Sequence, residues 1–293
     1  MIKKISIVLI VFIISVCVVF STGIKIQSVE ISGHKVYFNE SGSGEKNILF
    51  VHGLFASKEQ WNGMMQFFSE KGYHCYALDL PGYGQSVGYP LNSYTFQNEA
   101  NYLSEFIERE QITHVNLVGN SMGTAIVSLY THQHFRNVNT LTYIGGAVGV
   151  SNTSDAFSFH QKTGVNPFIP TTVDQFKFEL SLLFYKPPVL SSSQMENIVK
   201  MYTENLSHYQ AVYKIFAQQN DEFYKKYNGK FSCPVFVIWG EQDKILIPPP
   251  LSQIKKRVEN SQVILLSECG HLPMIEKTNI TNQAYLNFIQ SVK

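Results

Sequence analysis

The sequence predicts an α/β fold in which a mostly parallel central sheet is flanked by helices, with a helical cap inserted between late strands. Short, continuous apolar runs at 47–51, 75–80 and 115–118 have the length and character of buried parallel strands. Segments with apolar residues at helical spacing, 57–69 and 93–110, separate these runs. Alternation of this kind favours a parallel sheet with right-handed crossovers.

The first elements along the chain are a hairpin, a strand and a helix. Residues 28–32 and 34–38 alternate in polarity and are joined at Gly33, which is typical of a hairpin. A buried strand follows, and after it the apolar spacing predicts the first helix. Ser57 is the expected N-cap of that helix, and Gln60 stands three residues later, as a capping box requires.

The alternation of strands and helices is interrupted between residues 150 and 230. This segment is rich in Phe, Tyr, Ser, Asn and Thr and contains no strong strand run, so we interpret it as a mostly helical insertion. The predicted division is therefore a core of residues 24–149 and 231–293 with a cap of residues 150–230. Around the cap, strands are expected at 141–144, 235–239 and 263–266, and helices at 124–131, at 251–258 and from Asn279 onwards.

The composition excludes several classes of protein. The chain has 293 residues, of which 44% are hydrophobic and 15% charged, which is incompatible with a disordered protein. Lys and Arg number 23 against 22 Asp and Glu, so the formal net charge is only +1 and we expect no nucleic-acid partner. Outside the N-terminal segment, Cys75, Cys233 and Cys269 show neither a disulfide framework nor zinc-ligand spacing. No metal and no cofactor is expected.

The N-terminal segment, residues 1–23, is set apart from the rest of the chain. Lys3 and Lys4 precede an uncharged apolar run over 5–20, and small residues follow at Ser21 and Gly23. This pattern is typical of a signal peptide or signal anchor, and the length of the run favours the uncleaved anchor. Because the lysines stay on the cytoplasmic side, we expect a membrane-associated protein whose body faces outward.

The run Gly119-Asn120-Ser121-Met122-Gly123 matches the pattern G-x-S-x-G, in which a serine serves as nucleophile. It follows a predicted buried strand and precedes a predicted helix, which is the context that the motif needs. The turn is so tight that only small flanking residues avoid clashes, hence Gly119 and Gly123. We therefore predict that Ser121 is a nucleophile lifted above the end of the sheet.

Two further residues are expected to complete a catalytic triad with Ser121. A serine hydroxyl needs a base, and His271 lies just beyond the last predicted strand. The base needs a carboxylate, and Asp243 lies just beyond the preceding strand. Glu241 is the rival acid, but Asp243 stands farther along the loop, where it can reach back. The chain order Ser, Asp, His agrees with the motif.

A tetrahedral oxyanion needs two backbone N–H donors. One is predicted to be Met122, the residue after the nucleophile. The other is expected in the loop after His52-Gly53, with Leu54 as the first candidate and Phe55 as the second. His52 is expected to brace this loop through hydrogen bonds and not to act as a second base.

Several motifs in the same order resemble those of the α/β-hydrolase superfamily. They are His52-Gly53, the run Asp79-Leu80-Pro81-Gly82-Tyr83-Gly84-Gln85-Ser86, the turn at Ser121, Asp243 and Gly270-His271. The resemblance covers nearly all of residues 26–293 and implies the fold and the triad of that superfamily. Thr124 departs from the pattern, because many members carry Gly there, and its side chain is expected to crowd the contact between helix and strand.

Within that superfamily the chain resembles bacterial lipases of the lipase 1 type and membrane-anchored monoacylglycerol lipases. The residues that carry this resemblance are 119–123, 184–188 and 270–276. It implies hydrolysis of fatty-acid esters, with a lipid-like ester as substrate. The cap would roof the site, and Phe55 and Phe184 are predicted to bind the acyl chain.

Two other functions stay open at the level of sequence. Carbon–carbon bond hydrolases share the Gly-Asn-Ser-Met-Gly turn, although the loop of residues 54–57 lacks the Ser and Gly usual in them. A non-catalytic binding protein of the same fold is the other alternative, and the complete triad argues against it. Haloalkane dehalogenases use Asp as nucleophile, and residue 121 is Ser.

Overall fold

The computed structural model describes residues 23–146, 154–226 and 229–292. The predicted N-terminal anchor lies outside the described residues, as does the predicted junction between core and cap at residues 149 and 150. Within the described ranges, no helix has both the length and the apolar character needed to span a membrane.

The core is an eight-stranded sheet with the order β1-β2-β4-β3-β5-β6-β7-β8. The strands β1 and β2 form the predicted hairpin, and β2 pairs with β4 antiparallel, whereas all later pairings are parallel. The mostly parallel sheet predicted from the alternating pattern is thus confirmed. The strands are β1 (Lys25–Ile31), β2 (His34–Ser41), β3 (Lys46–Val51), β4 (Tyr73–Leu78), β5 (Val115–Asn120), β6 (Val138–Ile144), β7 (Val235–Gly240) and β8 (Ser261–Leu266).

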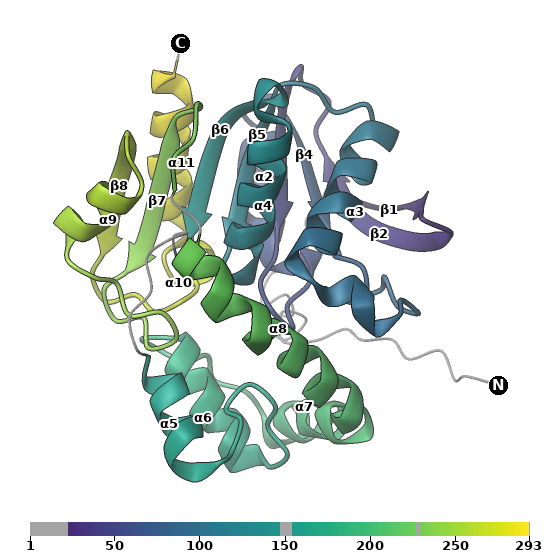
Figure 1. The fold of residues 1–293 in the computed structure, drawn as a ribbon, viewed down its shortest axis with the longest axis vertical. Helices are drawn as coiled ribbons and strands as arrows, with labels where there is room; N and C mark the ends of the chain where they lie inside the picture. The colour runs from purple at the N-terminus through teal and green to yellow at the C-terminus, as the bar shows by residue number, and fades with distance from the viewer. Residues whose placement is uncertain (1–22, 147–153, 227–228, 293) are drawn as a thin grey trace.

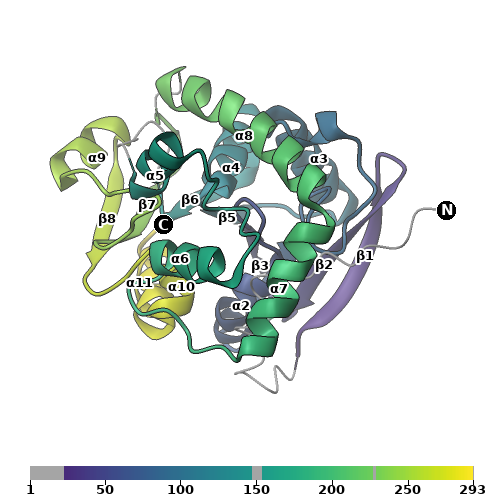
Figure 2. The ribbon, with the colours of Figure 1, turned by 90° about the horizontal axis from the view of Figure 1, so that it is seen from below.

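Helices cover both faces of this sheet (Figure 2). One face carries α2 (Asn62–Ser69) and α11 (Thr278–Ser291), which lie on the same side of the sheet and contact each other. The other carries α3 (Phe96–Arg109), α4 (Met122–Gln133) and α9 (Leu251–Arg257). Because both faces are covered, β5 and β7 are buried along their whole length, which explains their continuous apolar sequences.

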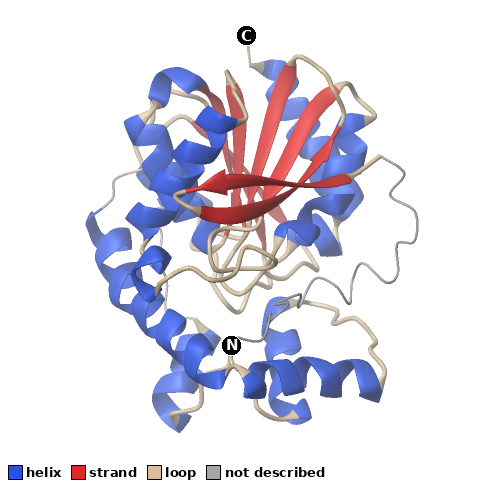
Figure 3. Ribbon diagram, turned by 90° about the vertical axis from the view of Figure 1, so that its right-hand side faces the viewer, coloured by secondary structure: helices blue, strands red, loops and turns tan. Residues whose placement is uncertain are grey.

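The helical cap lies between β6 and β7, as predicted. Figures 1 and 3 show it as a separate layer beyond one end of the sheet, with α8 running obliquely beneath the strands. It faces the carboxyl ends of the parallel strands, where the backbone N–H of His271 donates to the carbonyl of Leu183 in the cap at 2.8 Å. Its helices are α5 (Asp155–Thr163), α6 (Val173–Leu183), α7 (Ser192–Glu204) and α8 (Leu206–Lys226).

Two predicted helices differ in detail from the observed ones. The first begins with a 3-10 turn, η1 (Lys58–Trp61), and the Ser57 side chain makes no capping hydrogen bond, so the predicted capping box is wrong. The second is preceded by another 3-10 turn, η2 (Leu91–Tyr94), and is capped by Thr95. The final helix, predicted from Asn279 onwards, is confirmed as α11, and a short additional helix, α10 (Pro273–Glu276), precedes it.

The order of the strands determines where a ligand binds. The chain passes from β3 to β4 on one side, and β5 then lies on the other side of β3. A crevice forms where the direction of winding reverses, outside the carboxyl ends of the strands. Here those ends carry the loop after His52 and the turn at Ser121, and the cap covers them.

Candidate active site

Ser121 lies in a strained turn between β5 and α4. Its backbone has φ 51° and ψ −120°, a left-handed conformation that costs energy for any residue with a side chain. A Cβ on Gly119 would lie 2.6 Å from the carbonyl oxygen of Gly123, and one on Gly123 would lie 2.5 Å from that of Val51. Only glycine fits at either position. Thr124, the departure noted in the sequence, is buried, and its hydroxyl donates to the Ser121 carbonyl at 2.6 Å.

Asp243 and His271 meet at the rim of the sheet, in the loops after β7 and β8. The distance from His271 Nδ1 to Asp243 Oδ2 is 2.7 Å, and both side chains are buried. The Asp243 carboxylate also accepts the Trp239 Nε1–H and the backbone N–H groups of Ile245 and Leu246, at 2.8 to 2.9 Å. A carboxylate with these donors is itself an acceptor, so His271 donates from Nδ1, and Nε2 is the nitrogen left to act as the base.

Glu241, the rival acid, does not contact His271. Its side chain is exposed, and its backbone N–H donates to the carbonyl of Leu266 at the end of β8. The structure places Asp243 against His271 and leaves Glu241 in solvent. The shorter acid, two residues farther along the loop, is therefore the one within reach of the imidazole.

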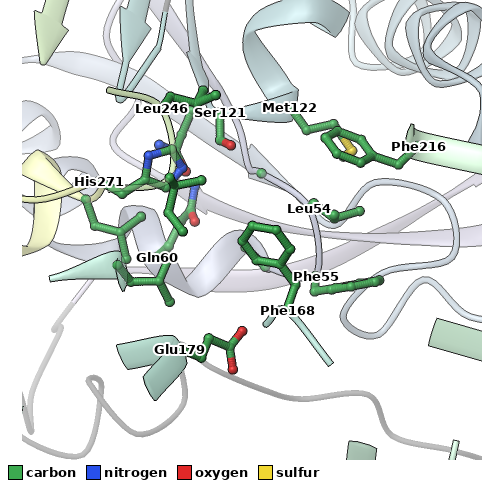
Figure 4. A pocket seen from close by; sticks show the side chains of 16 residues that line it. Leu54, Phe55, Gln60, Ser121, Met122, Phe168, Glu179, Phe216, Leu246 and His271 are labelled. Atoms are coloured by element: carbon green, nitrogen blue, oxygen red, sulfur yellow. The ribbon is translucent and has the colours of Figure 1, made fainter. Parts of the chain in front are cut away.

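Ser121 and His271 line the same pocket (Figure 4). Among the described residues, no hydrogen bond joins Ser121 Oγ to the imidazole. Such contacts are often long in a free enzyme and shorten when the substrate binds. All three predicted triad residues are thus brought to one rim, with the His271–Asp243 link formed.

The loop after β3 approaches Ser121 closely. A Cβ on Gly53 would lie 3.1 Å from Ser121 Cβ, so the absence of a side chain at Gly53 permits the approach. The loop then turns through Phe55, whose φ is 56°, and the Ala56 N–H donates to the Gly53 carbonyl. Leu54 therefore lies beside the nucleophile and lines the pocket.

The two predicted oxyanion donors, Leu54 and Met122, have backbone N–H groups without a protein acceptor in the described part of the chain. For Met122 this follows from its place as the first residue of α4, because the first N–H groups of a helix have no partner within it. Free amides flanking a nucleophile are what an oxyanion hole requires. The geometry is consistent with the prediction for both residues.

His52 holds the loop after β3 against the loop after β4. Its Nε2 accepts the Leu80 N–H at 3.0 Å, and its Nδ1 lies 2.8 Å from the Gly53 carbonyl oxygen. Since Nε2 is an acceptor, Nδ1 is the donor and the ring is neutral. Complete burial lowers the pKa of His52 to about 4. The ring braces the loop, as predicted.

The loop after β4 is held by a buried ion pair. Lys58 Nζ lies 2.8 Å from Asp79 Oδ2, and both side chains are fully buried. Burial lowers the pKa of Lys58, but the charges of Asp79 and Glu59 outweigh it and leave that pKa above its ordinary value. Asp79 also accepts the Gln85 N–H at 2.8 Å. The loop carries Tyr83, whose hydroxyl lies 3.7 Å from Met122 Sδ, so the pair stiffens a wall of the site.

The space between the atoms around Ser121, including the part continuous with solvent, amounts to about 840 Å³. Its walls come from the core loops and from the cap, and most of the side chains are apolar. Phe55, predicted to bind the acyl chain, is among them. The lining residues are Gly53, Leu54, Phe55, Ala56, Gln60, Asn120, Ser121, Met122, Phe168, Glu179, Leu183, Phe216, Ile245, Leu246, His271 and Leu272.

Phe184 does not line this pocket, contrary to the prediction. Its side chain is buried in the core cluster at the end of α6, and its neighbour Leu183 faces the pocket instead. The backbone at this point packs on the loop that carries His271. A Cβ on Gly270 would lie 2.5 Å from the Leu183 carbonyl oxygen and 2.9 Å from Phe184 Cα. This segment thus positions the base and does not provide the chain-binding surface predicted for Phe184.

Sequence reasoning missed most of the cap residues in the pocket. Phe168, Glu179 and Phe216 come from three different parts of the cap, and no motif links them. The sequence pattern predicts that Gln60 belongs to a capping box with Ser57, whereas in the structure Gln60 lines the pocket. Only the enrichment of the cap in aromatic residues indicated that some of them face a ligand.

Comparisons with known proteins agree with this geometry. The sequence profile of the alpha/beta hydrolase fold matches residues 46–278. Lipase 1 of Psychrobacter immobilis is 26% identical over 264 residues, which cover 88% of this chain and 81% of that protein. The monoacylglycerol lipase ABHD6 of Bos taurus is 25% identical over 256 residues, covering 84% and 76%. The crystal structure of a bacterial membrane phospholipase A superposes with a TM-score of 0.81 at 26% identity, covering 92% and 87%.

The fold, the turn at Ser121 and the covered pocket define a hydrolase of the α/β class. The chain belongs to the alpha/beta hydrolase fold family, whose profile spans most of its length. The bacterial lipases and the monoacylglycerol lipases are its distant homologues, as the sequence resemblance indicated.

The two candidate acids predict different outcomes on substitution. Asp243→Asn is expected to lower kcat for a p-nitrophenyl ester on the order of 10⁴-fold, because an amide holds the imidazole in the wrong tautomer and cannot stabilise its charge. Glu241→Gln, the matched change two residues away, is expected to leave kcat within about twofold. Steady-state kinetics on the two purified variants checks this. A larger loss in the Glu241 variant would contradict the assignment.

The buried His52 predicts a pH dependence of stability. Its pKa is about 4 in the folded chain and 6.5 ordinarily, so the unfolded chain binds the extra proton between these values. The stabilisation is present above pH 6.5 and is lost as the pH falls toward 4. We expect the free energy of unfolding to fall by about 3 kcal/mol more in the wild type than in His52→Gln. Urea unfolding at pH 7 and pH 4 measures this, with His114→Gln as the exposed control. Parallel losses in the wild type and His52→Gln would contradict it.

Proposed function

We propose that this protein is a serine hydrolase that cleaves carboxylic esters of fatty acids through an acyl-enzyme. The observation that carries the proposal is the His271 Nδ1–Asp243 Oδ2 contact of 2.7 Å beside a strained Ser121, in a pocket that is mostly apolar. The three named relatives are a lipase, a monoacylglycerol lipase and a phospholipase A. The names of all three indicate a substrate that is an ester of a fatty acid.

In the acylation step, Ser121 Oγ attacks the ester carbonyl carbon while His271 Nε2 takes its proton. Asp243 accepts the hydrogen bond from Nδ1 and stabilises the imidazolium that forms. The carbonyl oxygen becomes an oxyanion, which the N–H groups of Leu54 and Met122 stabilise. The imidazolium then gives its proton to the leaving alcohol oxygen as the carbon–oxygen bond breaks.

In the deacylation step, water takes the place of the alcohol. His271 Nε2 accepts a proton from the water as its oxygen attacks the acyl carbonyl. The tetrahedral intermediate collapses, the fatty acid leaves, and the proton returns to Ser121 Oγ. The same two N–H groups stabilise both oxyanions, so one arrangement serves both halves of the reaction.

The walls of the pocket suit an acyl chain. Leu54, Phe55 and Leu183 lie on its lining together with Phe168 and Phe216, and each buries apolar surface when a hydrocarbon enters. An apolar site of this kind favours a fatty acyl group over a short polar one. The alcohol half of the substrate leaves from the same pocket.

We propose further that the N-terminal segment tethers this body at the outer face of a membrane. Support comes from Lys3 and Lys4 followed by the apolar run at 5–20. A tethered enzyme meets lipid esters where they are most concentrated.

The proposal predicts ester hydrolysis that depends on the hydroxyl group of Ser121. The purified full chain in detergent is expected to hydrolyse p-nitrophenyl esters in a series from acetate to palmitate, with the highest kcat/KM at a medium or long chain because of the apolar walls. Ser121→Ala is expected to lower kcat by more than about 10⁴-fold, because no other group in the triad can form the acyl-enzyme.

The matched control is Ser207→Ala, since Ser207 is exposed on α8 of the cap. It is expected to keep the wild-type rate. Equal rates for the wild type and Ser121→Ala would contradict the serine mechanism. Turnover of none of the esters by folded wild-type protein would favour the non-catalytic binding protein.

A further inference from the structure

Two polar side chains in the pocket are buried without a hydrogen-bond partner. Gln60 is 4% exposed and its Nε2 has none, and Glu179 is 2% exposed and its Oε2 has none. Other buried polar atoms in the described part of the chain share this property, including both carboxyl oxygens of Glu99. Among these residues, however, only Gln60 and Glu179 line the pocket that contains Ser121.

Leaving such groups unpaired costs free energy. A buried donor or acceptor without a partner loses the hydrogen bonds that it makes to water in the unfolded chain. In native proteins most buried polar groups are therefore paired, and an exception calls for an explanation. For Gln60 the alternative was a capping box at Ser57, which is not formed. Its amide instead belongs to the pocket lining.

Glu179 reaches the pocket from helix α6 of the cap. Among the described residues, no ion pair includes its carboxyl group, and burial raises the pKa of Glu179 well above its ordinary value. This shift favours the protonated carboxyl, which can donate as well as accept a hydrogen bond.

Figure 4 shows where the two side chains lie. Ser121 and His271 occupy one side of the view, and the Glu179 carboxyl lies across the pocket, beyond the ring of Phe168. The rest of the lining is mostly apolar. A substrate that consisted of hydrocarbon away from its ester group would cover Gln60 and Glu179 without pairing either.

The chemistry of the pair indicates which group it recognises. The Gln60 amide both donates and accepts, and the Glu179 carboxyl accepts and, when protonated, also donates. Among the described residues that line the pocket, none is a Lys or Arg that would hold an anion such as a phosphate or a free carboxylate. An uncharged hydroxyl, which also donates and accepts, is the complementary group.

We propose that Gln60 and Glu179 form a polar subsite that hydrogen-bonds a hydroxyl group of the ester substrate. The enzyme then prefers esters that carry a hydroxyl away from the scissile bond over esters that are plain hydrocarbon. This inference rests on the proposed ester hydrolysis at Ser121. The hydroxyl can belong to the alcohol half, as in a glycerol monoester, or to the acyl chain, and the experiment separates the two.

Two matched pairs of substrates test the subsite. The first pair is 1-decanoylglycerol and propyl decanoate, which differ in the hydroxyls of the alcohol. The second is p-nitrophenyl 10-hydroxydecanoate and p-nitrophenyl decanoate, which differ at the end of the acyl chain. The measured quantity is the ratio of kcat/KM within a pair, because any general loss of activity in a variant cancels. We expect a ratio of about ten or more for one pair in the wild type.

The variants separate hydrogen bonding from packing. Glu179→Leu and Gln60→Leu remove the polar group and are expected to bring that ratio toward one. Glu179→Gln keeps a neutral hydrogen-bonding group of the same size and is expected to retain most of the preference. The matched control is Glu196→Leu on the exposed face of α7, which is expected to keep the wild-type ratio.

The outcomes distinguish this inference from the proposed function. Ratios near one for both pairs in the wild type overturn the subsite, and so does a ratio that Glu179→Leu and Gln60→Leu leave unchanged. If an ordered water, and not a substrate hydroxyl, pairs Gln60 and Glu179, the ratios are near one for both pairs of substrates. In either case, hydrolysis of the plain esters that Ser121→Ala abolishes leaves the proposed function standing. If Glu179→Leu does not fold, Gln60→Leu and Glu179→Gln decide the question.

Discussion

The site depends on one constraint, the close packing of backbone around Ser121. A left-handed serine at the end of a buried strand requires that α4 start directly against β3 and β5, and the contacts of Gly119 and Gly123 leave no room for a side chain. The same approach brings the Gly53 loop beside the nucleophile, and Met122, the first residue of α4, lines the pocket there. The strain is supported by the sheet, in which β3 and β5 are central strands buried by helices on both faces.

The surrounding loops are held by polar groups that are fully paired. His52 joins two loops as a neutral ring, Lys58 and Asp79 neutralise each other in the interior, and Asp243 accepts four N–H groups. A buried pair of charges contributes little net stability but is costly to break, so it favours one arrangement of the loop. Gln60 Nε2 and Glu179 Oε2 are buried without a partner, and they differ from the other unpaired buried atoms of the described residues because both side chains line the pocket.

The sequence predicted the parts of the molecule that local rules determine. Continuous apolar runs marked the strands, and the spacing of glycines around Ser121 marked the turn, because each signal lies within a few residues. It also placed Asp243 and His271 at the ends of successive strands. It could not predict that Phe184 turns into the core while Leu183 faces the pocket, because that depends on how α6 packs on the Gly270 loop. The predicted capping box at Ser57 is wrong for a similar reason, because Gln60 lines the pocket as a result of tertiary packing.

The central claim is that Ser121, His271 and Asp243 act as one relay. The most direct measurement is the rate at which a fluorophosphonate forms a covalent adduct with the full chain, with the modified residue located by mass spectrometry of peptides. The account predicts one adduct per chain, on Ser121, and a rate on the order of 10³-fold lower in His271→Ala, in which no base takes the serine proton. An adduct on another residue, or an equal rate in His271→Ala, would contradict it.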